Sequence, residues 1–173
     1  MEFLRGKTAI VTGAAGGIGE AICKKLASMG LNLVITGRKV QALEELAAQL
    51  PTKVHCCVGD LQELSFVDRL LAETREVFGG VDVIINNAGL SHNCTVEEMT
   101  PELFDSIMRV NVRAPYFLCQ KAVEDLKKIG VCHHHQYLLC GGSQGLPPAE
   151  RVCCQQACPS GLFQVLCQRA LQG

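Results

Sequence analysis

The chain has 173 residues, of which 48% are hydrophobic, and this is enough apolar material for one domain whose core needs no disulfide bonds. Its formal net charge of −1 gives no basic surface, which argues against nucleic acid or an anionic membrane as the principal partner. No apolar run approaches the roughly eighteen residues that span a bilayer, and the first residues carry no export signal. We therefore expect a cytoplasmic location, with the eleven cysteines reduced.

Strand-like and helix-like segments alternate along the first 130 residues. The expected strands, which are short β-branched or apolar runs, are Thr8–Val11, Leu31–Thr36, Lys53–Cys57 and Val81–Asn86. The expected helices, which are amphipathic, are Gly17–Met29, Val40–Gln49 and Glu63–Phe78, then one that starts after Thr100 with Pro101 in its first turn, and one from about Val112 to Lys128. This alternation predicts an α/β fold, a doubly wound parallel sheet with helices on both faces.

A glycine-rich turn joins the first predicted strand to the first predicted helix. Its sequence is Thr-Gly-Ala-Ala-Gly-Gly-Ile-Gly, over residues 12–19, and the helix that follows carries Ile18, Ile22 and Leu26 on one face. Glycines suit such a turn because a Cβ would block the positive-φ backbone or the approach of a pyrophosphate to the helix N-terminus. The free N–H groups and the dipole of that helix end favour anions.

Three further motifs follow later elements. Asp60 lies just past the third predicted strand, where its carboxylate can accept a hydrogen bond from an adenine amino group. Asn-Asn-Ala-Gly, at residues 86–89, follows the fourth strand, and its small residues let the backbone lie close to a ribose. Asn111 ends the segment Phe-Asp-Ser-Ile-Met-Arg-Val-Asn. In this order and at these distances, the four motifs together resemble the short-chain dehydrogenase/reductase family over about residues 4–130.

The resemblance implies a Rossmann-type sheet, a nicotinamide dinucleotide, and hydride transfer between a small-molecule carbonyl and an alcohol. It gives Asn111 a catalytic role, that of holding a water in the proton relay. The cofactor-binding residues that it implies are Gly13, Gly17, Ile18 and Gly19 in the turn, Asp60 and Leu61 at the adenine, and Asn87, Ala88 and Gly89 at the ribose.

The end of the second predicted strand bears on the choice of cofactor. Sites that prefer NAD place an acid there for the ribose 2′-hydroxyl, whereas this chain has Gly37 followed by Arg38 and no acid. The guanidinium of Arg38 can pair with a 2′-phosphate, so NADP is favoured over NAD. The alternative is that Arg38 is a solvated residue at a helix start.

The residues that should complete the catalytic site are missing after Gly130. The family uses a Tyr-x-x-x-Lys pair, in which the tyrosine transfers the proton, together with an upstream serine that orients the carbonyl. Here Tyr116 is followed four residues later by Gln120, and Tyr137 by Gly141. Without that acid, the chain loses the rate enhancement from general acid–base catalysis, which is roughly hundred- to ten-thousand-fold. We expect an impaired NADP-dependent short-chain oxidoreductase or, alternatively, a catalytically inactive dinucleotide-binding remnant.

Residues 131–173 differ in composition from residues 1–130. They hold six of the eleven cysteines and three of the five histidines, but only three charged residues. Reading codons from their second base permits the family's fifth strand and serine near residues 133–138, and Tyr-Ala-Ala-Ser-Lys near residues 152–157. A frameshift near Gly130 explains both gaps, and a divergent or spliced C-terminus is the competing account. We expect a dinucleotide-binding domain over 1–130 and an aberrant tail over 131–173.

Other chemistries have weaker support. The adjacent His133, His134 and His135 point in different directions, so we expect incidental metal affinity and no built metal site. Residues 141–145, Gly-Gly-Ser-Gln-Gly, match a nucleophile elbow, but two prolines interrupt the helix that a hydrolase needs next. His92 and Cys94 either line a substrate pocket or belong to a solvated loop.

The missing C-terminal part also bears on assembly. Family chains are longer, and their last strands, substrate loop and much of their oligomer interface follow the point where this resemblance ends. We therefore expect a sheet that is incomplete at its C-terminal end and a chain that self-associates as a homo-oligomer through the exposed edge.

Overall fold

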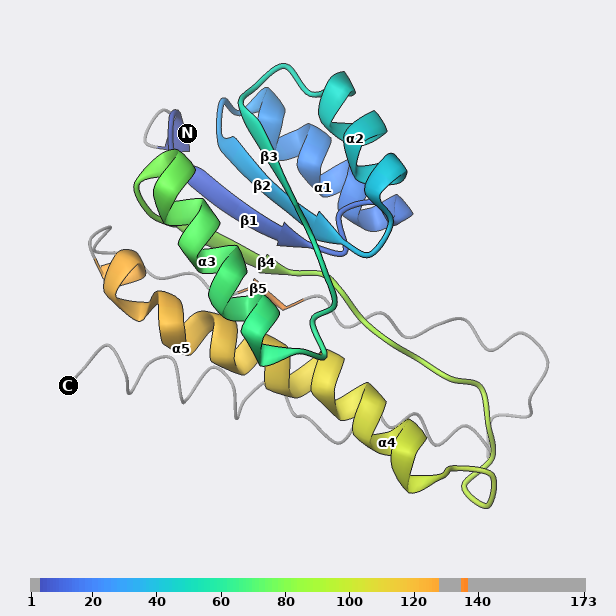
Figure 1. The fold of residues 1–173 in the computed structure, drawn as a ribbon. Helices are drawn as coiled ribbons and strands as arrows, with labels where there is room; N and C mark the ends of the chain where they lie inside the picture. The colour runs from blue at the N-terminus through green and yellow to red at the C-terminus, as the bar shows by residue number, and fades with distance from the viewer. Residues whose placement is uncertain (1–3, 128–134, 137–173) are drawn as a thin grey trace.

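The structure, a computed structural model, describes residues 4–127 and 135–136, which form one parallel sheet with helices on both faces (Figure 1). The strands are β1 (Thr8–Thr12), β2 (Asn32–Gly37), β3 (Val54–Val58), β4 (Val83–Asn86) and β5 (His135–Gln136). The helices are α1 (Gly17–Ser28), α2 (Val40–Gln49), α3 (Leu64–Phe78), α4 (Pro101–Met108) and α5 (Ala114–Lys127), with a π-helical turn η2 (Arg109–Arg113) between the last two.

The strand order is β3-β2-β1-β4-β5, and every pairing is parallel. The predicted doubly wound sheet is therefore confirmed, with strand boundaries that differ from the predicted ones by one or two residues. The chain moves outward from β1 through β2 to β3 and then crosses back to place β4 on the other side of β1. The glycine-rich turn after β1 consequently lies where the strand order reverses, the usual position of ligands in open α/β sheets.

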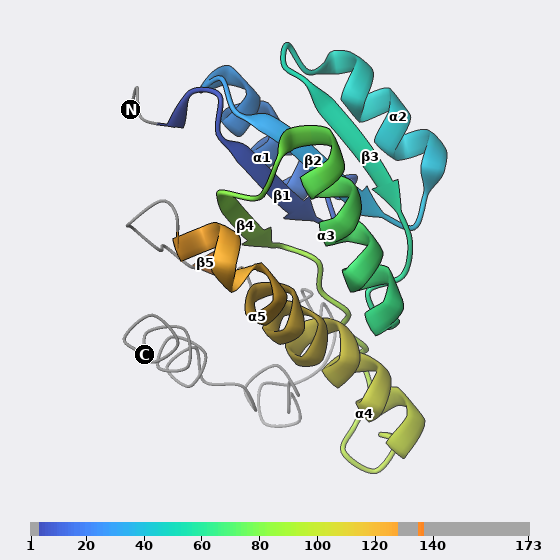
Figure 2. The same cartoon turned by 60° about the vertical axis from the view of Figure 1, so that its left-hand side comes forward.

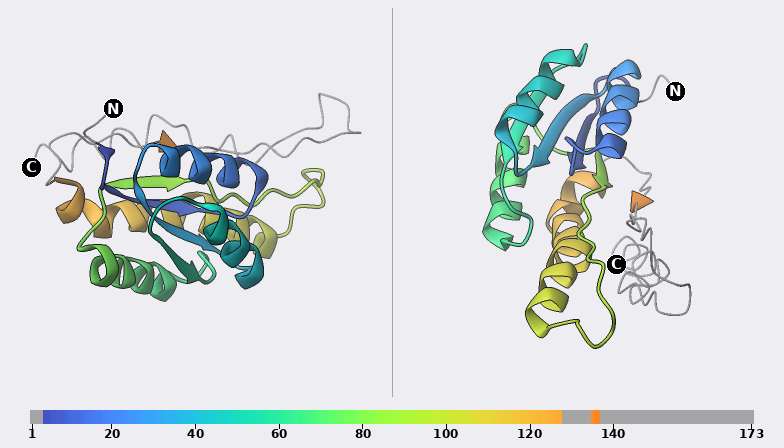
Figure 3. Two further views of the ribbon diagram at one scale, coloured as in Figure 1. Left: turned by 90° about the horizontal axis from the view of Figure 1, so that it is seen from above. Right: turned by 90° about the vertical axis from the view of Figure 1, so that its right-hand side faces the viewer.

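Alternating side chains of the central strands build a core on each face of the sheet. Ile10 and Val34 pack with residues of α3 and α5, whereas Val11 and Ile35 pack with residues of α1 and α2. All five residues of β1 are buried, as expected for a strand covered on both faces. Figure 3 shows α1 and α3 on opposite sides of the sheet.

Small residues form the buried face of α1. The sequence pattern placed Ile18, Ile22 and Leu26 on one face of this helix, but Ile18 is 47% exposed. The residues that are buried form a row one position further along the helix. That row consists of Gly19, Cys23 and Ala27. Because these side chains are short, the backbone of α1 can lie close to the sheet at the glycine-rich turn. Burial raises the pKa of the Cys23 thiol to about 12, so this cysteine is a packing residue and not a nucleophile.

The structure differs from the prediction between residues 101 and 127. The predicted long helix from about Val112 is instead the last part of one continuous rod, in which α4 passes through η2 into α5 (Figure 1). The predicted start of this rod after Thr100 is correct, and Thr100 caps it, because its Oγ1 accepts a hydrogen bond from the N–H of Leu103 at 3.2 Å. The π-helical turn was missed because its backbone bonding leaves no mark on the sequence pattern.

Helices α3 and α5 lie side by side (Figure 2) and are joined by two ion pairs. Arg75 Nε donates to Asp125 Oδ2 at 2.8 Å, and Lys121 pairs with Asp68. The Asp125 side chain is only 8% exposed, which makes its pair with Arg75 the better shielded of the two. These contacts fix α5, and with it η2, relative to the sheet.

Candidate functional site

A cavity of about 370 Å³ opens at the carboxyl ends of β1, β2, β3 and β4. All ten residues predicted to bind a cofactor line it: Gly13, Gly17, Ile18, Gly19, Arg38, Asp60, Leu61, Asn87, Ala88 and Gly89. The other residues that line it are Ala15, Gly16, Gly37, Lys39, Gly59, Gln62, Leu90 and Val110. The lining residues, which run from Gly13 to Val110 in the sequence, lie around one cavity because the carboxyl ends of parallel strands meet at one edge of the sheet.

The glycine-rich turn forms the wall of the cavity nearest α1. Gly13 has φ of 64°, and a Cβ at this position would lie 2.9 Å from the Cα of Ala88. A Cβ at Gly19 would lie 2.3 Å from the carbonyl oxygen of Gly13, whereas one at Gly17 would meet nothing within 4 Å. Gly16 supplies no side-chain cap to α1, so the first N–H groups of this helix remain available to an anion.

Thr12 holds the loop after β4 against this turn. Its Oγ1 accepts hydrogen bonds from the backbone N–H groups of Asn87, at 3.1 Å, and Ala88, at 3.0 Å, and donates to the carbonyl of Ile85. In return, Asn87 Nδ2 donates to the carbonyls of Thr12 and Gly13, both at 3.0 Å. This role of Thr12 could not be predicted from the sequence, because its partners lie more than seventy residues away.

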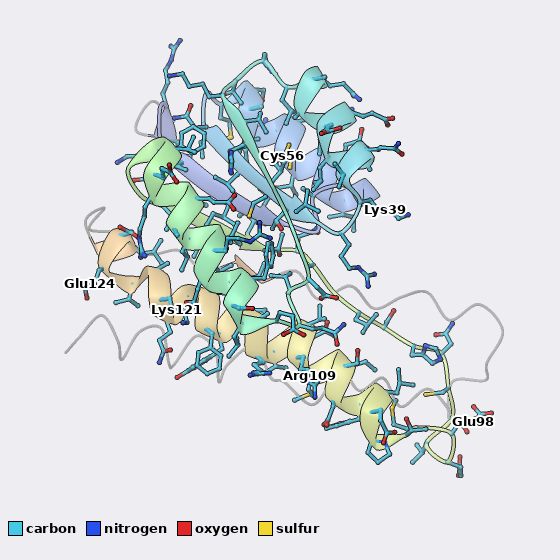
Figure 4. The ribbon with its side chains drawn as sticks, in the orientation of Figure 1. Lys39, Cys56, Glu98, Arg109, Lys121 and Glu124 are labelled. Atoms are coloured by element: carbon cyan, nitrogen blue, oxygen red, sulfur yellow. The ribbon has the colours of Figure 1, made fainter. Side chains whose placement is uncertain are left out.

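Two consecutive basic residues, Arg38 and Lys39, line the cavity where β2 ends and α2 begins. Figure 4 labels Lys39 at this junction. Lys39 was not among the predicted residues, although it follows Arg38 directly in the sequence. No acidic residue lines this part of the cavity, and Asp60, beyond β3, is the only carboxylate among the described lining residues.

The carboxylate of Asp60 is oriented by the loop that follows β3. The backbone N–H of Gln62 donates to Asp60 Oδ1 at 2.9 Å. The preceding Gly59 is required by packing, because a Cβ there would lie 2.2 Å from the ring of Phe66. Glycine at this position lets the loop pass over the Phe66 ring and brings Asp60 to the edge of the cavity.

Asn111 lies in η2 and is 5% exposed. Its Oδ1 accepts a hydrogen bond from the N–H of Leu90, and its Nδ2 donates to the carbonyl of Leu90, both at 2.8 Å. Asn111 itself does not line the cavity, but its neighbour Val110 and its partner Leu90 do. The predicted catalytic residue thus supports the part of the cavity wall that the loop after β4 forms.

A second group of titratable residues lies on β3 and α3, outside the cavity. His55 Nε2 donates to Glu73 Oε2 at 2.8 Å, and this bond holds the pKa of Glu73 below its ordinary value of 4.5. Burial, followed by the effect of Glu73, raises the pKa of Cys57 to about 12. These residues stabilise the contact between strand and helix.

The remaining predictions concern residues away from the cavity. Neither His92 nor Cys94 is among the described residues that line it. In the part of the chain that the structure describes, no three histidine, cysteine or acidic side chains are grouped so as to hold a metal. The histidine run, apart from His135 in β5, and the Gly-Gly-Ser-Gln-Gly segment of the tail fall outside the described residues. None of the described helices is long and apolar enough to cross a bilayer.

The family model described as short chain dehydrogenase matches residues 7–131. An uncharacterised oxidoreductase of Staphylococcus epidermidis is 35% identical over 128 residues, which cover 74% of this chain and 56% of that protein. D-beta-hydroxybutyrate dehydrogenase of Cupriavidus necator is 30% identical over 129 residues, which cover 73% of this chain and 50% of that enzyme.

Among solved structures, L-sorbose reductase from Gluconobacter frateurii, complexed with NADPH and L-sorbose, superimposes with a TM-score of 0.70 at 30% identity. The match covers 75% of this chain and 51% of the reductase. The chain therefore spans about half the length of these relatives.

Proposed function

Because the chain belongs to the short-chain dehydrogenase/reductase family, we propose that its cavity binds NADPH and that the intact parent protein uses this cofactor to interconvert a small carbonyl compound and its alcohol. The observation that carries the proposal is the convergence of ten predicted residues on one cavity at the reversal of strand order. The oxidoreductases among the relatives support the reaction class.

The residues present fit a dinucleotide. The open space at Gly17 and the uncapped start of α1 suit a pyrophosphate, which the first N–H groups of the helix would hold. Asp60 would accept a hydrogen bond from the adenine amino group. The backbone at Ala88 and Gly89, fixed by Thr12, would lie along a ribose. The bound nicotinamide would supply the hydride, and this chain's own residues would bind and orient it.

The preference for NADPH over NADH rests on Arg38 and Lys39. Both line the cavity at the position where an acid would bind a ribose 2′-hydroxyl, and two cations there favour a 2′-phosphate. The NADPH in the L-sorbose reductase structure is consistent with this choice. Arg38→Asp should reverse the preference in a fluorescence titration, and Lys25→Asp, an exposed change on α1, is the matched control. Equal affinities for the two cofactors before and after the Arg38 exchange would contradict the assignment.

We further propose that this chain transfers protons poorly. Asn111 is present, but no tyrosine in the 173 residues has a lysine four positions later. Reduction of a carbonyl needs a proton for the developing alkoxide, and positioning the reactants does not supply one. A catalytically inactive dinucleotide-binding remnant is the second candidate function, and the same missing pair favours it. An assay over a panel of small ketones and aldehydes separates the two candidates by the presence or absence of turnover.

The origin of the tail, the location and the assembly state remain part of the proposal. The altered composition after Gly130 supports a frameshift relative to a longer parent, and the nucleotide sequence around codon 130 tests it. Self-association would bury the edge of the sheet at which β5, a strand of two residues, lies, and analytical ultracentrifugation of the full chain measures it.

A further inference from the structure

Gln62 connects the loop after β3 to helix α4. It lines the cavity two residues after Asp60, to which its backbone N–H donates. Its side-chain Oε1 accepts a hydrogen bond from Ser106 Oγ at 3.0 Å, and the two residues are 44 positions apart in the sequence. Both side chains are half-buried, so the bond is partly shielded from solvent. Gln62 is therefore held at one end by Asp60 and at the other by the helical rod.

The same rod carries Asn111. Positions 106 and 111 are five residues apart, roughly 7 Å along an uninterrupted helical axis. The Asn111 side chain binds both the N–H and the carbonyl of Leu90, another cavity-lining residue. The rod is thus attached to one loop at Ser106 and to a different loop at Asn111. The π-helical turn η2, a type of turn frequent at functional sites, begins between these two attachments.

We propose that the Gln62–Ser106 hydrogen bond is a positioning contact that couples occupancy of the adenine end of the cavity to the placement of Asn111. A nucleotide bound by Asp60 fixes the loop that contains Gln62. Gln62 then fixes Ser106 and the rod, and the rod fixes Asn111 on Leu90. The inference rests on the proposed function, because it requires the ligand of Asp60 to be an adenine nucleotide. Gln62 and Ser106 act through other residues and touch no reacting atom.

Amide hydrogen exchange at Leu90 reports on this coupling, because its N–H donates to Asn111 Oδ1. The probe is 2′,5′-ADP, which carries the adenine and the 2′-phosphate but no nicotinamide. In the full chain, the probe should slow exchange at Leu90 several-fold more than at Ile84, a buried strand residue that reports overall stability. Ser106→Ala should bind the probe yet lose the extra protection, whereas Ser106→Thr, which keeps the hydroxyl, should retain it.

A second pair of variants gives the same test if Ser106→Ala does not fold. Gln62→Ala should lose the extra protection at Leu90, and Gln120→Ala, an exposed change on α5, should keep it. If variants without the Gln62–Ser106 bond bind the probe and protect Leu90 as the unaltered chain does, the bond couples nothing and the inference is wrong. If the probe slows exchange at no cavity residue of the unaltered chain, including Gly13 and Gly19, the proposed function fails and this inference fails with it.

Discussion

The two ends of the cavity differ in how many of the expected functional residues are present. At the nucleotide end, the glycine turn, Arg38 and Asp60 are all present and are fixed by backbone geometry or local hydrogen bonds. At the reaction end, Asn111 is held in place on Leu90, but the chain has no tyrosine with a lysine four positions later. On the proposed function, nucleotide binding and proton transfer would depend on different segments of the chain, and this chain would retain the first function without the second.

The difference has a physical origin in the order of the elements. The nucleotide end uses turns that directly follow β1 to β4, so the sheet that forms the core also forms the binding surface. The missing acid would come from residues after α5 and would depend on a longer stretch of correctly folded chain.

Turnover should show the largest effect. We expect this chain to reduce small ketones and aldehydes roughly hundred- to ten-thousand-fold more slowly than an intact relative, because no general acid serves the alkoxide. Steady-state NADPH consumption measures the rate, with L-sorbose reductase from Gluconobacter frateurii as the family member for comparison. Rates of ordinary enzyme size would mean that another residue donates the proton and that the two ends are equally complete.

The close approach at Gly19 should produce the next largest effect. Gly19→Ala places a Cβ 2.3 Å from the carbonyl oxygen of Gly13, and we expect it to lower the free energy of unfolding by roughly 1–3 kcal/mol. Gly17→Ala is the matched control, because its Cβ meets nothing within 4 Å and alanine favours helices by up to about 1 kcal/mol. Urea unfolding measures both. Equal effects of the two substitutions would show that the turn tolerates a shift of α1.

The hydroxyl of Thr12 tests how firmly the two loops of the nucleotide end are joined. Thr12→Val keeps the shape of the side chain but removes the acceptor of the Ala88 N–H and one of two acceptors of the Asn87 N–H, the other being the Ile85 carbonyl. We expect a loss of about 2 kcal/mol in the free energy of unfolding, together with weaker NADPH binding. Thr52→Val, on the loop before β3, removes a single bond to the Leu31 carbonyl and serves as the control for stability alone. Unchanged NADPH affinity in Thr12→Val would show that this network does not shape the site.

Most of the fold and of the cavity could be predicted from the sequence because both depend on local patterns. Apolar runs and amphipathic periods place the strands and helices, and the glycines mark the turn where the strand order reverses. The buried row of α1 was less visible, because Gly19 and Ala27 are small and contribute to packing by allowing close approach. Hydrophobic pattern alone points instead to the larger Ile18, which is exposed.

The parts that the sequence did not predict are long-range polar contacts and the π-helical turn. Thr12 bonds to residues about 75 positions away, and Gln62 bonds to a residue 44 positions away. Serine, threonine and glutamine are common in every context, so their partners become visible only when the strands are assembled. The turn η2, whose first residue Arg109 is labelled in Figure 4, depends on backbone bonding that many helical sequences can adopt.

The smallest effect should come from Glu73, which lies outside the cavity. The hydrogen bond from His55 lowers its pKa, so Glu73 stabilises the folded state above its ordinary value of 4.5, and that contribution is lost as the pH falls through its lower folded pKa. Glu73→Gln should therefore reduce the loss of stability below pH 4.5 and leave NADPH affinity at neutral pH unchanged. Glu76→Gln, an exposed change on the same helix, is the control. An altered NADPH affinity would show that the β3 and α3 contact shapes the nucleotide end.

The most direct test of the central claim is a calorimetric titration of the full 173-residue chain with NADPH, repeated with NADH. We predict saturable binding of one NADPH per chain with clearly weaker binding of NADH, because the nucleotide end is complete and carries Arg38 and Lys39. Absence of NADPH binding by the folded chain would contradict the account. It would mean that nucleotide binding also needs parts of the longer relatives that this chain does not match.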